Sequence, residues 1–212
     1  FETININVMG VANALEAARL ANVDRILYAS TMYVYSPFGS FYRASKQAAE
    51  TIIEAYHEQY QLNYTLLRYG SLYGPRAQSW NGLRKYVSDI VKKRKLEYFG
   101  TGQERREYIH VKDAARLSVD VLESSHRNKA ITVTGSQAMY SSELIDLIFE
   151  ISGVKKNVVF KDLESRSDHY SLTPYRYTPK QAHKLVPNQF IDLGQGVLEL
   201  VEEINEEKDT AK

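Results

Sequence analysis

Short β-rich runs and amphipathic helical stretches alternate along the first part of the chain, and this alternation limits the possible folds more than any other feature of the sequence. The apolar runs lie at residues 25–30, 64–69 and 130–134, and the helix-like stretches between or before them include 6–22 and 42–61. Parallel strands need a long connection that crosses back over the sheet, and a helix usually makes it. We therefore predict an α/β fold built on a parallel sheet.

The rest of the chain is predicted to form a smaller lobe beside that sheet. We assign residues 1–134 to the sheet domain, with 76–110 contributing to the lobe, 135–207 mainly to the lobe itself, and 208–212 to a frayed tail. Helices are expected near 179–185 and 193–206. Asp113 is expected to cap the helix that follows it.

Composition excludes several classes of function. The 212 residues carry a net charge of +1 and include no cysteine. This charge gives no reason to expect a nucleic acid or an anionic membrane as a partner. The lack of cysteine excludes disulfides, thiolate catalysis and cysteine-based zinc sites. Because we find neither a membrane-spanning apolar run nor a signal peptide, we expect a cytoplasmic protein, and we assign no metal site.

Tyr42 and Lys46 lie four residues apart at the start of a predicted helix, so they share one helix face. A free phenol titrates near pH 10, and an ammonium group beside it favours the phenolate form that can act as a base. The alternative is a surface pair that contributes only a few tenths of a kcal/mol to helix stability, roughly the value for such neighbours. Tyr-x-x-x-Lys alone does not decide between these two interpretations.

A series of motifs in a fixed order favours the acid/base interpretation of Tyr42 and Lys46 over the surface-pair interpretation. They are Asn-x-x-Gly at 7–10, Ser-Thr-x-x-Val-Tyr at 30–35, Tyr-x-x-x-Lys at 42–46, Leu-Arg-x-x-Ser-x-Tyr-Gly-Pro-Arg at 67–76, and Gly-x-Gly-x-x-x-Arg-Glu-x-Ile-His-Val-x-Asp at 100–113. This order resembles that of the extended short-chain dehydrogenase/reductases, in particular the NAD-dependent nucleotide-sugar epimerase/dehydratase family typified by UDP-glucose 4-epimerase. The resemblance implies an NAD(P)-binding Rossmann-like sheet with a small C-terminal substrate lobe.

The resemblance also implies roles for individual residues. Tyr42 would be the acid/base group, Lys46 would hold the nicotinamide ribose, and Thr31 would orient the sugar hydroxyl. The implied cofactor-binding residues are Asn7, Ser30, Tyr42, Lys46 and Tyr69, and the implied substrate-binding residues are Thr31, Ser71, Asn81, Phe99, Arg106, Arg166 and Asp168. Each role has a simpler alternative: Thr31 could merely end a strand, Tyr69 and Phe99 could pack in the core, and Arg106 could be a solvated charge.

One feature of the family is absent from the sequence. Rossmann-like folds hold the cofactor pyrophosphate on a Gly-rich turn between a strand and a helix, and no such turn occurs here. We expect that roughly the first third of a family member, with its first four strands, is missing, which would leave the strand at 25–30 with an unpaired edge. The sequence could be part of a longer enzyme, which we favour, a genuine fragment, or a chain completed by a partner.

The residues after Thr31 narrow the implied chemistry. Family dehydratases carry Asp-Glu there and decarboxylases carry Glu, whereas this chain has Met32 and Tyr33. The resemblance therefore favours a 4-epimerase that uses NAD, with NADP not excluded, on a nucleotide sugar, most simply a UDP-sugar. The alternatives are a keto-reductase or dehydrogenase of the same family and a non-catalytic binding or dimerisation module. Ser71 replaces the Asn that is usual at this position of the family motif. The expected assembly is a homodimer through helices 6–22 and 43–61.

Overall fold

The computed structural model describes residues 1–161 and 183–210, and its centre is a parallel sheet. The strand order is β1-β2-β6-β9, and every neighbouring pair is parallel. The strands are β1 (Arg25–Thr31), β2 (Asn63–Tyr69), β6 (Lys129–Val133) and the short β9 (His183–Lys184). The parallel α/β arrangement expected from the alternating pattern is therefore present. Within the described residues, β1 forms one edge of the sheet.

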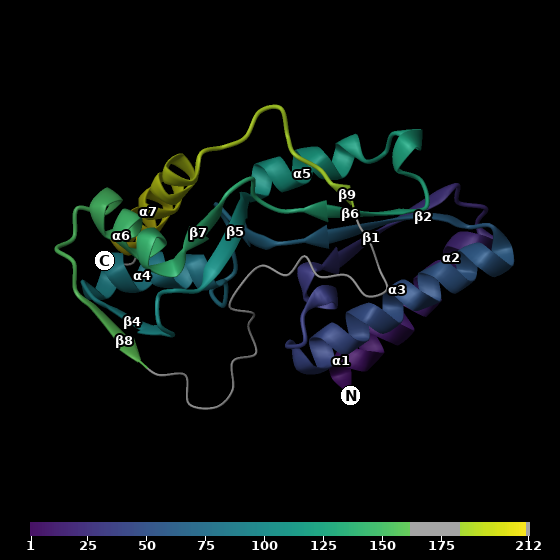
Figure 1. Cartoon of the computed structure of the whole chain (residues 1–212), viewed down its shortest axis with the longest axis horizontal. Helices are drawn as coiled ribbons and strands as arrows, with labels where there is room; N and C mark the ends of the chain where they lie inside the picture. The colour runs from purple at the N-terminus through teal and green to yellow at the C-terminus, as the bar shows by residue number, and fades with distance from the viewer. Residues whose placement is uncertain (162–182, 211–212) are drawn as a thin grey trace.

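Helices cover both faces of this sheet (Figure 1). One face carries a continuous helical segment and the long α3; these are α1 (Glu2–Ile4), the π-helical η1 (Asn5–Met9), α2 (Gly10–Leu20) and α3 (Ser40–Tyr60). They bury an apolar cluster that includes Leu15, Ile53 and Leu66. The opposite face carries α5 (Val111–Asp120), whose Leu117 packs with Leu67 and other strand residues. Burying apolar side chains on both faces is the expected stabilisation of a parallel sheet.

A second group of elements lies beside the sheet, at the α6 and α7 end of the molecule in Figure 1. It contains a three-stranded sheet of β3 (Ser71–Tyr73), β5 (Arg105–His110) and β7 (Ala138–Tyr140), and a parallel pair of β4 (Leu96–Phe99) and β8 (Val158–Lys161). Its helices are α4 (Gly82–Lys93), α6 (Ser141–Ile151) and α7 (Leu193–Thr210). These helices share one buried core with β4. The two short 3-10 turns of the chain's described part are η2 (Met32–Tyr35) and η3 (Ser124–His126).

Several local expectations were wrong. The side chain of His110, not of Asp113, caps α5 by accepting a hydrogen bond from the Lys112 N–H. The Asp113 carboxylate lies in the first turn and accepts a hydrogen bond from the Ile191 N–H at 2.7 Å. Residues 183–184 form strand β9 rather than the end of a helix, because they pair with β6. Helix α7 continues to Thr210, so the predicted tail at 208–212 is helical at its start.

Candidate active site

A cleft of about 820 Å³ opens where β1 and β2 end and the second group of elements begins. Ligands of open α/β sheets bind at this carboxyl edge of the strands. The cleft is lined by most of the residues proposed from the sequence: Ser30, Thr31, Tyr42, Lys46, Tyr69, Ser71, Asn81, Phe99 and Arg106. Residues from both halves of the molecule therefore face one space.

The start of α3 brings Tyr42 to the cleft. Gly39 precedes the helix with a φ of 109°, a conformation that glycine adopts without strain. A Cβ atom at Gly39 would lie 2.7 Å from a ring carbon of Tyr33, so the glycine lets Tyr33 pack closely against the helix start. The Tyr33 ring in turn lies edge-on to Tyr42, with 5.9 Å between ring centroids. Tyr42 is 44% exposed, so its phenol is open to a ligand.

Lys46 lies one helical turn further along the same face of α3. Its Nζ atom is 5.9 Å from the Tyr42 ring centroid and 4.9 Å from the Tyr28 ring centroid. It donates a hydrogen bond to the Ala29 carbonyl oxygen of β1 at 3.0 Å. Burial lowers the pKa of the Lys46 ammonium, and the negative charge of Glu50 opposes that effect. The lysine is therefore fixed between strand and helix, with its charge beside the phenol.

Thr31 ends β1 at the rim of the cleft and is buried. Its Oγ1 atom accepts a hydrogen bond from the Tyr33 N–H at 3.3 Å, which begins the turn η2. Because this bond uses the oxygen as an acceptor, the threonine hydroxyl can still donate its proton to a ligand.

A buried ionic network lies beneath these residues. The Glu50 carboxylate of α3 accepts hydrogen bonds from Arg68 Nε at 2.9 Å and Arg68 Nη2 at 2.7 Å. It also accepts one from the Ser30 hydroxyl at 2.6 Å. Arg68 Nη1 donates to the Tyr35 hydroxyl, and the Arg68 guanidinium lies 4.7 Å from the Tyr35 ring centroid. Sequence reasoning did not identify Glu50 or Arg68, although Glu50 follows Lys46 by four residues on one helix face.

The opposite wall of the cleft carries the residues proposed for the substrate. Asn81 caps α4 by accepting from the Arg84 N–H at 3.1 Å, and its amide donates to the Leu72 carbonyl oxygen at 2.9 Å. Phe99 is exposed at the rim rather than packed in the core, and Lys161 Nζ lies 5.7 Å from its ring centroid. Arg106 extends from β5 into the lining of the same cleft.

Other proposed residues lie elsewhere or are turned differently. The Asn7 amide donates to the Ser45 hydroxyl at 3.0 Å, which places Asn7 against α3 and outside the cleft lining. Tyr69 lines the cleft, but its hydroxyl is hydrogen-bonded to Ser118 of α5. Arg166 and Asp168 lie outside the described residues.

The cleft also contains residues that the motifs did not indicate. They include Tyr33, Gly70, Trp80, Lys85, Tyr86, Asp89, Glu97, Tyr98, Glu104 and Tyr108. Trp80 is the chain's single tryptophan and is 80% exposed. The position of the single tryptophan next to Asn81, a proposed substrate-binding residue, was the available sequence signal for this wall.

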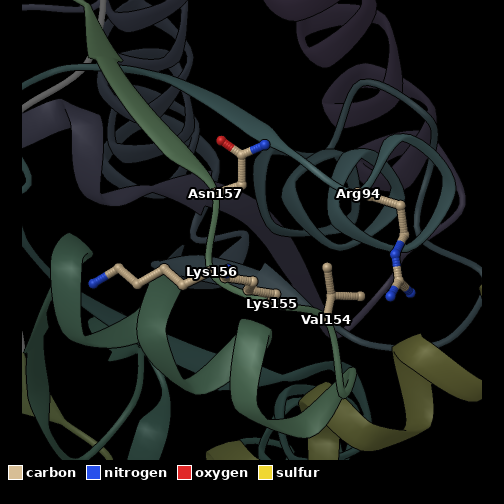
Figure 2. A pocket seen from close by; sticks show the side chains of 5 residues that line it. All are labelled: Arg94, Val154, Lys155, Lys156 and Asn157. Atoms are coloured by element: carbon tan, nitrogen blue, oxygen red, sulfur yellow. The ribbon is translucent and has the colours of Figure 1, made fainter.

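A smaller open depression of about 370 Å³ lies just before the start of β8 and is lined by Arg94, Val154, Lys155, Lys156 and Asn157 (Figure 2). The cationic ends of Arg94 and Lys156 lie at opposite sides of it. Lys156 is paired with Asp146 at 2.5 Å. None of the residues proposed from the sequence lines this depression, so the larger cleft is the candidate active site.

The described residues offer neither a metal site nor a membrane-spanning helix. Within residues 1–161 and 183–210, no group of three or more His, Cys, Asp or Glu side chains is arranged to hold a metal ion. No helix in the same part of the chain is long and apolar enough to cross a membrane.

The cleft has the parts needed for proton transfer at a ligand hydroxyl. A partly exposed phenol can exchange a proton, a fixed ammonium beside it stabilises the phenolate, and a hydroxyl on the neighbouring strand end can orient the reacting group. The opposite wall adds an exposed aromatic ring and a guanidinium, which suit a base and a phosphate respectively.

The relatives found by sequence comparison are named as nucleotide-sugar epimerases and dehydratases. A protein from Bacillus subtilis named as an uncharacterised UDP-glucose epimerase is 25% identical over 74% of this chain and 54% of its own length. The mouse dTDP-D-glucose 4,6-dehydratase is 25% identical over 95% of this chain and 61% of its own length. The chain thus spans between about half and two thirds of the length of these curated relatives.

Solved structures share the fold. UDP-glucose 4-epimerase from Thermotoga maritima, solved with UDP-glucose, matches with a TM-score of 0.81 at 22% identity, over 97% of this chain and 71% of that one. A Bacillus cereus UDP-glucuronic acid 4-epimerase, solved with a substrate analogue and NAD, also matches with a TM-score of 0.81, at 20% identity and over 94% and 67% of the two chains. The predicted Rossmann-like α/β fold is confirmed.

The family itself follows from a match over more than half of the sequence. The model of the NAD dependent epimerase/dehydratase family matches residues 1–135, which contain the ordered motifs and the Tyr42–Lys46 pair. The chain therefore belongs to the NAD-dependent epimerase/dehydratase family.

Proposed function

We propose that the full-length protein is an NAD(P)-dependent nucleotide-sugar 4-epimerase that oxidises a sugar hydroxyl transiently. The observation that carries this proposal is the single cleft in which Thr31, Tyr42 and Lys46 face Phe99 and Arg106. An acid/base group and a nucleotide-binding wall are both required, because the reacting carbon belongs to a sugar held by its nucleotide.

Tyr42 carries the proton in this proposal. Its phenolate oxygen takes a proton from the sugar hydroxyl as the hydroxyl carbon is oxidised, and returns it after the sugar has turned over. The Lys46 charge stabilises the phenolate, and Thr31 Oγ1 donates a hydrogen bond that orients the substrate oxygen. Met32 and Tyr33, which follow Thr31, provide no carboxylic acid to eliminate water, which favours epimerisation over dehydration.

The cofactor fits the β1 side of the cleft. When bound, NAD supplies the acceptor and later the donor of hydride. Lys46, with one hydrogen bond already made to the Ala29 carbonyl, has further N–H donors for ribose hydroxyls. Ser30 and Tyr69 lie beside it in the cleft lining. These 212 residues contain no Gly-rich turn to hold the pyrophosphate. Cofactor binding should therefore be measured on the full-length protein.

The opposite wall fits a nucleotide diphosphate, and we propose a UDP-sugar. The Arg106 guanidinium suits the diphosphate because it can donate two parallel hydrogen bonds. The exposed Phe99 ring suits stacking with a base. Asn81 and Ser71 add short polar groups to the lining of the same cleft.

We also propose a cytoplasmic homodimer. Large apolar side chains on the N-terminal helical segment are exposed, among them Ile6, Met9 and Leu20. Such a stripe beside α3 suits a partner helix pair. Sedimentation of the full-length protein at micromolar concentration should give a dimer, and a monomer would contradict the proposed assembly.

The function is tested by product analysis. The full-length protein is incubated with UDP-glucose, UDP-glucuronic acid and UDP-N-acetylglucosamine in turn, and C4 inversion is followed together with the cofactor's redox state. Inversion without net consumption of NAD supports a 4-epimerase. Stoichiometric consumption of NAD(P)H would instead identify a reductase, and UDP-sugar binding without NAD binding in calorimetry would identify a non-catalytic module.

A further inference from the structure

The buried network under the cleft joins four separate elements through one carboxylate. Glu50 is completely buried in α3 and Arg68 nearly so in β2. The carboxylate meets Arg68 through two hydrogen bonds and Ser30 of β1 through a third. Arg68 extends the network to Tyr35 at the end of η2. All four elements border the cleft or lead into it.

Stability alone is a weak reason for such a pair. Removing two charges from water costs much of what their attraction returns, and buried ion pairs can often be replaced by apolar residues of similar volume without loss of stability. A bidentate Arg–Glu contact does fix orientation, because the guanidinium and the carboxylate are both planar and meet in one geometry. The pair is therefore better suited to holding elements in register than to adding stability.

The network touches the site through its immediate neighbours. Ser30 precedes Thr31, and Ser30 lies opposite Arg68 in the β1–β2 register. Glu50 lies one helical turn after Lys46 on the same face of α3. A shift of α3 against β1 would thus move Lys46 relative to Thr31.

We propose that Glu50 and Arg68 are positioning residues, whose buried ion pair fixes helix α3 against the ends of β1 and β2 and sets Lys46 and Thr31 around Tyr42. This inference rests on the proposed function. Among the described residues, the titratable groups that face Lys46 are Tyr28 of β1 and Tyr42 and Glu50 of α3, with Arg68 of β2 behind Glu50. Glu50 thus also provides a negative charge near the lysine.

The test uses variants of the full-length protein, with kcat expressed per folded protein, and the pH profile of kcat as a readout that lost stability would not move. Glu50→Gln keeps the shape of the side chain and removes its charge. We expect kcat to fall about tenfold or more, with KM within about threefold, and the alkaline limb of the kcat profile to move to lower pH. The direction follows because a half-buried ammonium that loses a nearby negative charge gives up its proton at a lower pH.

A double variant and a control complete the design. Glu50→Met with Arg68→Met replaces the ion pair by apolar side chains, and should show the same loss of kcat while keeping its melting temperature. Arg84→Met removes ion pairs with Glu203 and Glu207 between α4 and α7, outside the cleft lining. Its kcat and pH profile should match those of the wild type. If the double variant does not fold, the comparison of Glu50→Gln with Arg84→Met in kcat and pH profile still tests the inference.

Two results would overturn the inference. One is a wild-type kcat and pH profile for Glu50→Gln. The other is a loss of activity that follows the loss of folded protein while the pH profile stays unchanged. The Tyr42→Phe variant distinguishes a failure of this inference from a failure of the proposed function. If Tyr42→Phe is inactive and Glu50→Gln is not impaired, only the positioning role of the ion pair is wrong. If Tyr42→Phe is active, both the proposed function and the positioning role are wrong.

Discussion

Replacing Lys46 with methionine removes the charge beside the proposed acid/base group while keeping the length of the side chain. The Nζ atom lies 5.9 Å from the Tyr42 ring centroid. At that distance, and with an effective dielectric constant of 20, two unit charges attract by about 3 kcal/mol. Tyr42 is 44% exposed, so screening by water reduces this attraction to roughly 1.5–2.5 kcal/mol. Since 1.4 kcal/mol is a factor of ten, we expect kcat to fall by about 10- to 70-fold.

The assay is steady-state turnover of the full-length Lys46→Met variant, with Lys156→Met as the matched control. Lys156 is an exposed lysine paired with Asp146 at the depression of Figure 2, away from the cleft. Its replacement should leave kcat unchanged. A Lys46→Met variant that keeps more than a third of the wild-type kcat would refute the electrostatic role given to this lysine.

Other parts of the structure give further predictions. Because Trp80 is the single tryptophan and lines the cleft, UDP-sugar binding should change the protein's tryptophan fluorescence. An unchanged emission spectrum at a UDP-sugar concentration that calorimetry shows to be saturating would contradict the proposed substrate wall. Gly39→Ala should displace Tyr33 and lower the melting temperature, with a destabilisation of about 1–3 kcal/mol from strain at positive φ; an unchanged melting temperature would contradict it. Burial raises the pKa of the Glu104 carboxyl, but hydrogen bonds led by that from the Thr101 N–H outweigh burial and hold the pKa below its ordinary value. Its contribution to the unfolding free energy is therefore complete above about pH 4.5 and is lost as the pH falls below that value, so urea denaturation from pH 7 to 3 should show a smaller decline for Glu104→Gln.

The order of the helices and strands was predictable because local patterns of apolar and polar residues indicate it. The runs at 25–30, 64–69 and 130–134 became β1, β2 and β6 with bounds shifted by about one residue, since their apolar character and flanking polar residues are local signals. Strand β9 was missed because residues 183–184 adopt it by pairing with β6, some fifty residues earlier in the chain. Such pairing leaves no periodic pattern in so short a segment.

Cleft residues that belong to sequence motifs could be predicted, whereas residues that matter because they are buried could not. Tyr42, Lys46, Thr31 and the residues proposed for the opposite wall do line one cleft, and the roles that the resemblance implies for them stay predictions. Glu50 and Arg68 were not recognised, because charged residues are rarely buried and only the structure shows them paired. Tyr69 was expected near the nicotinamide half of the cofactor and it lines the cleft. The hydrogen bond of its hydroxyl to Ser118, a residue far away in the sequence, was not foreseen.

The central claim is that the Tyr42 phenol exchanges a proton with a sugar hydroxyl. The most direct test is single-turnover epimerisation by the full-length Tyr42→Phe variant, with binding of the UDP-sugar measured in parallel. Since phenylalanine keeps the ring and removes the hydroxyl, we predict UDP-sugar affinity within about threefold of wild type and turnover reduced by at least about 100-fold. Turnover near the wild-type rate in a variant that binds its substrate normally would contradict the account.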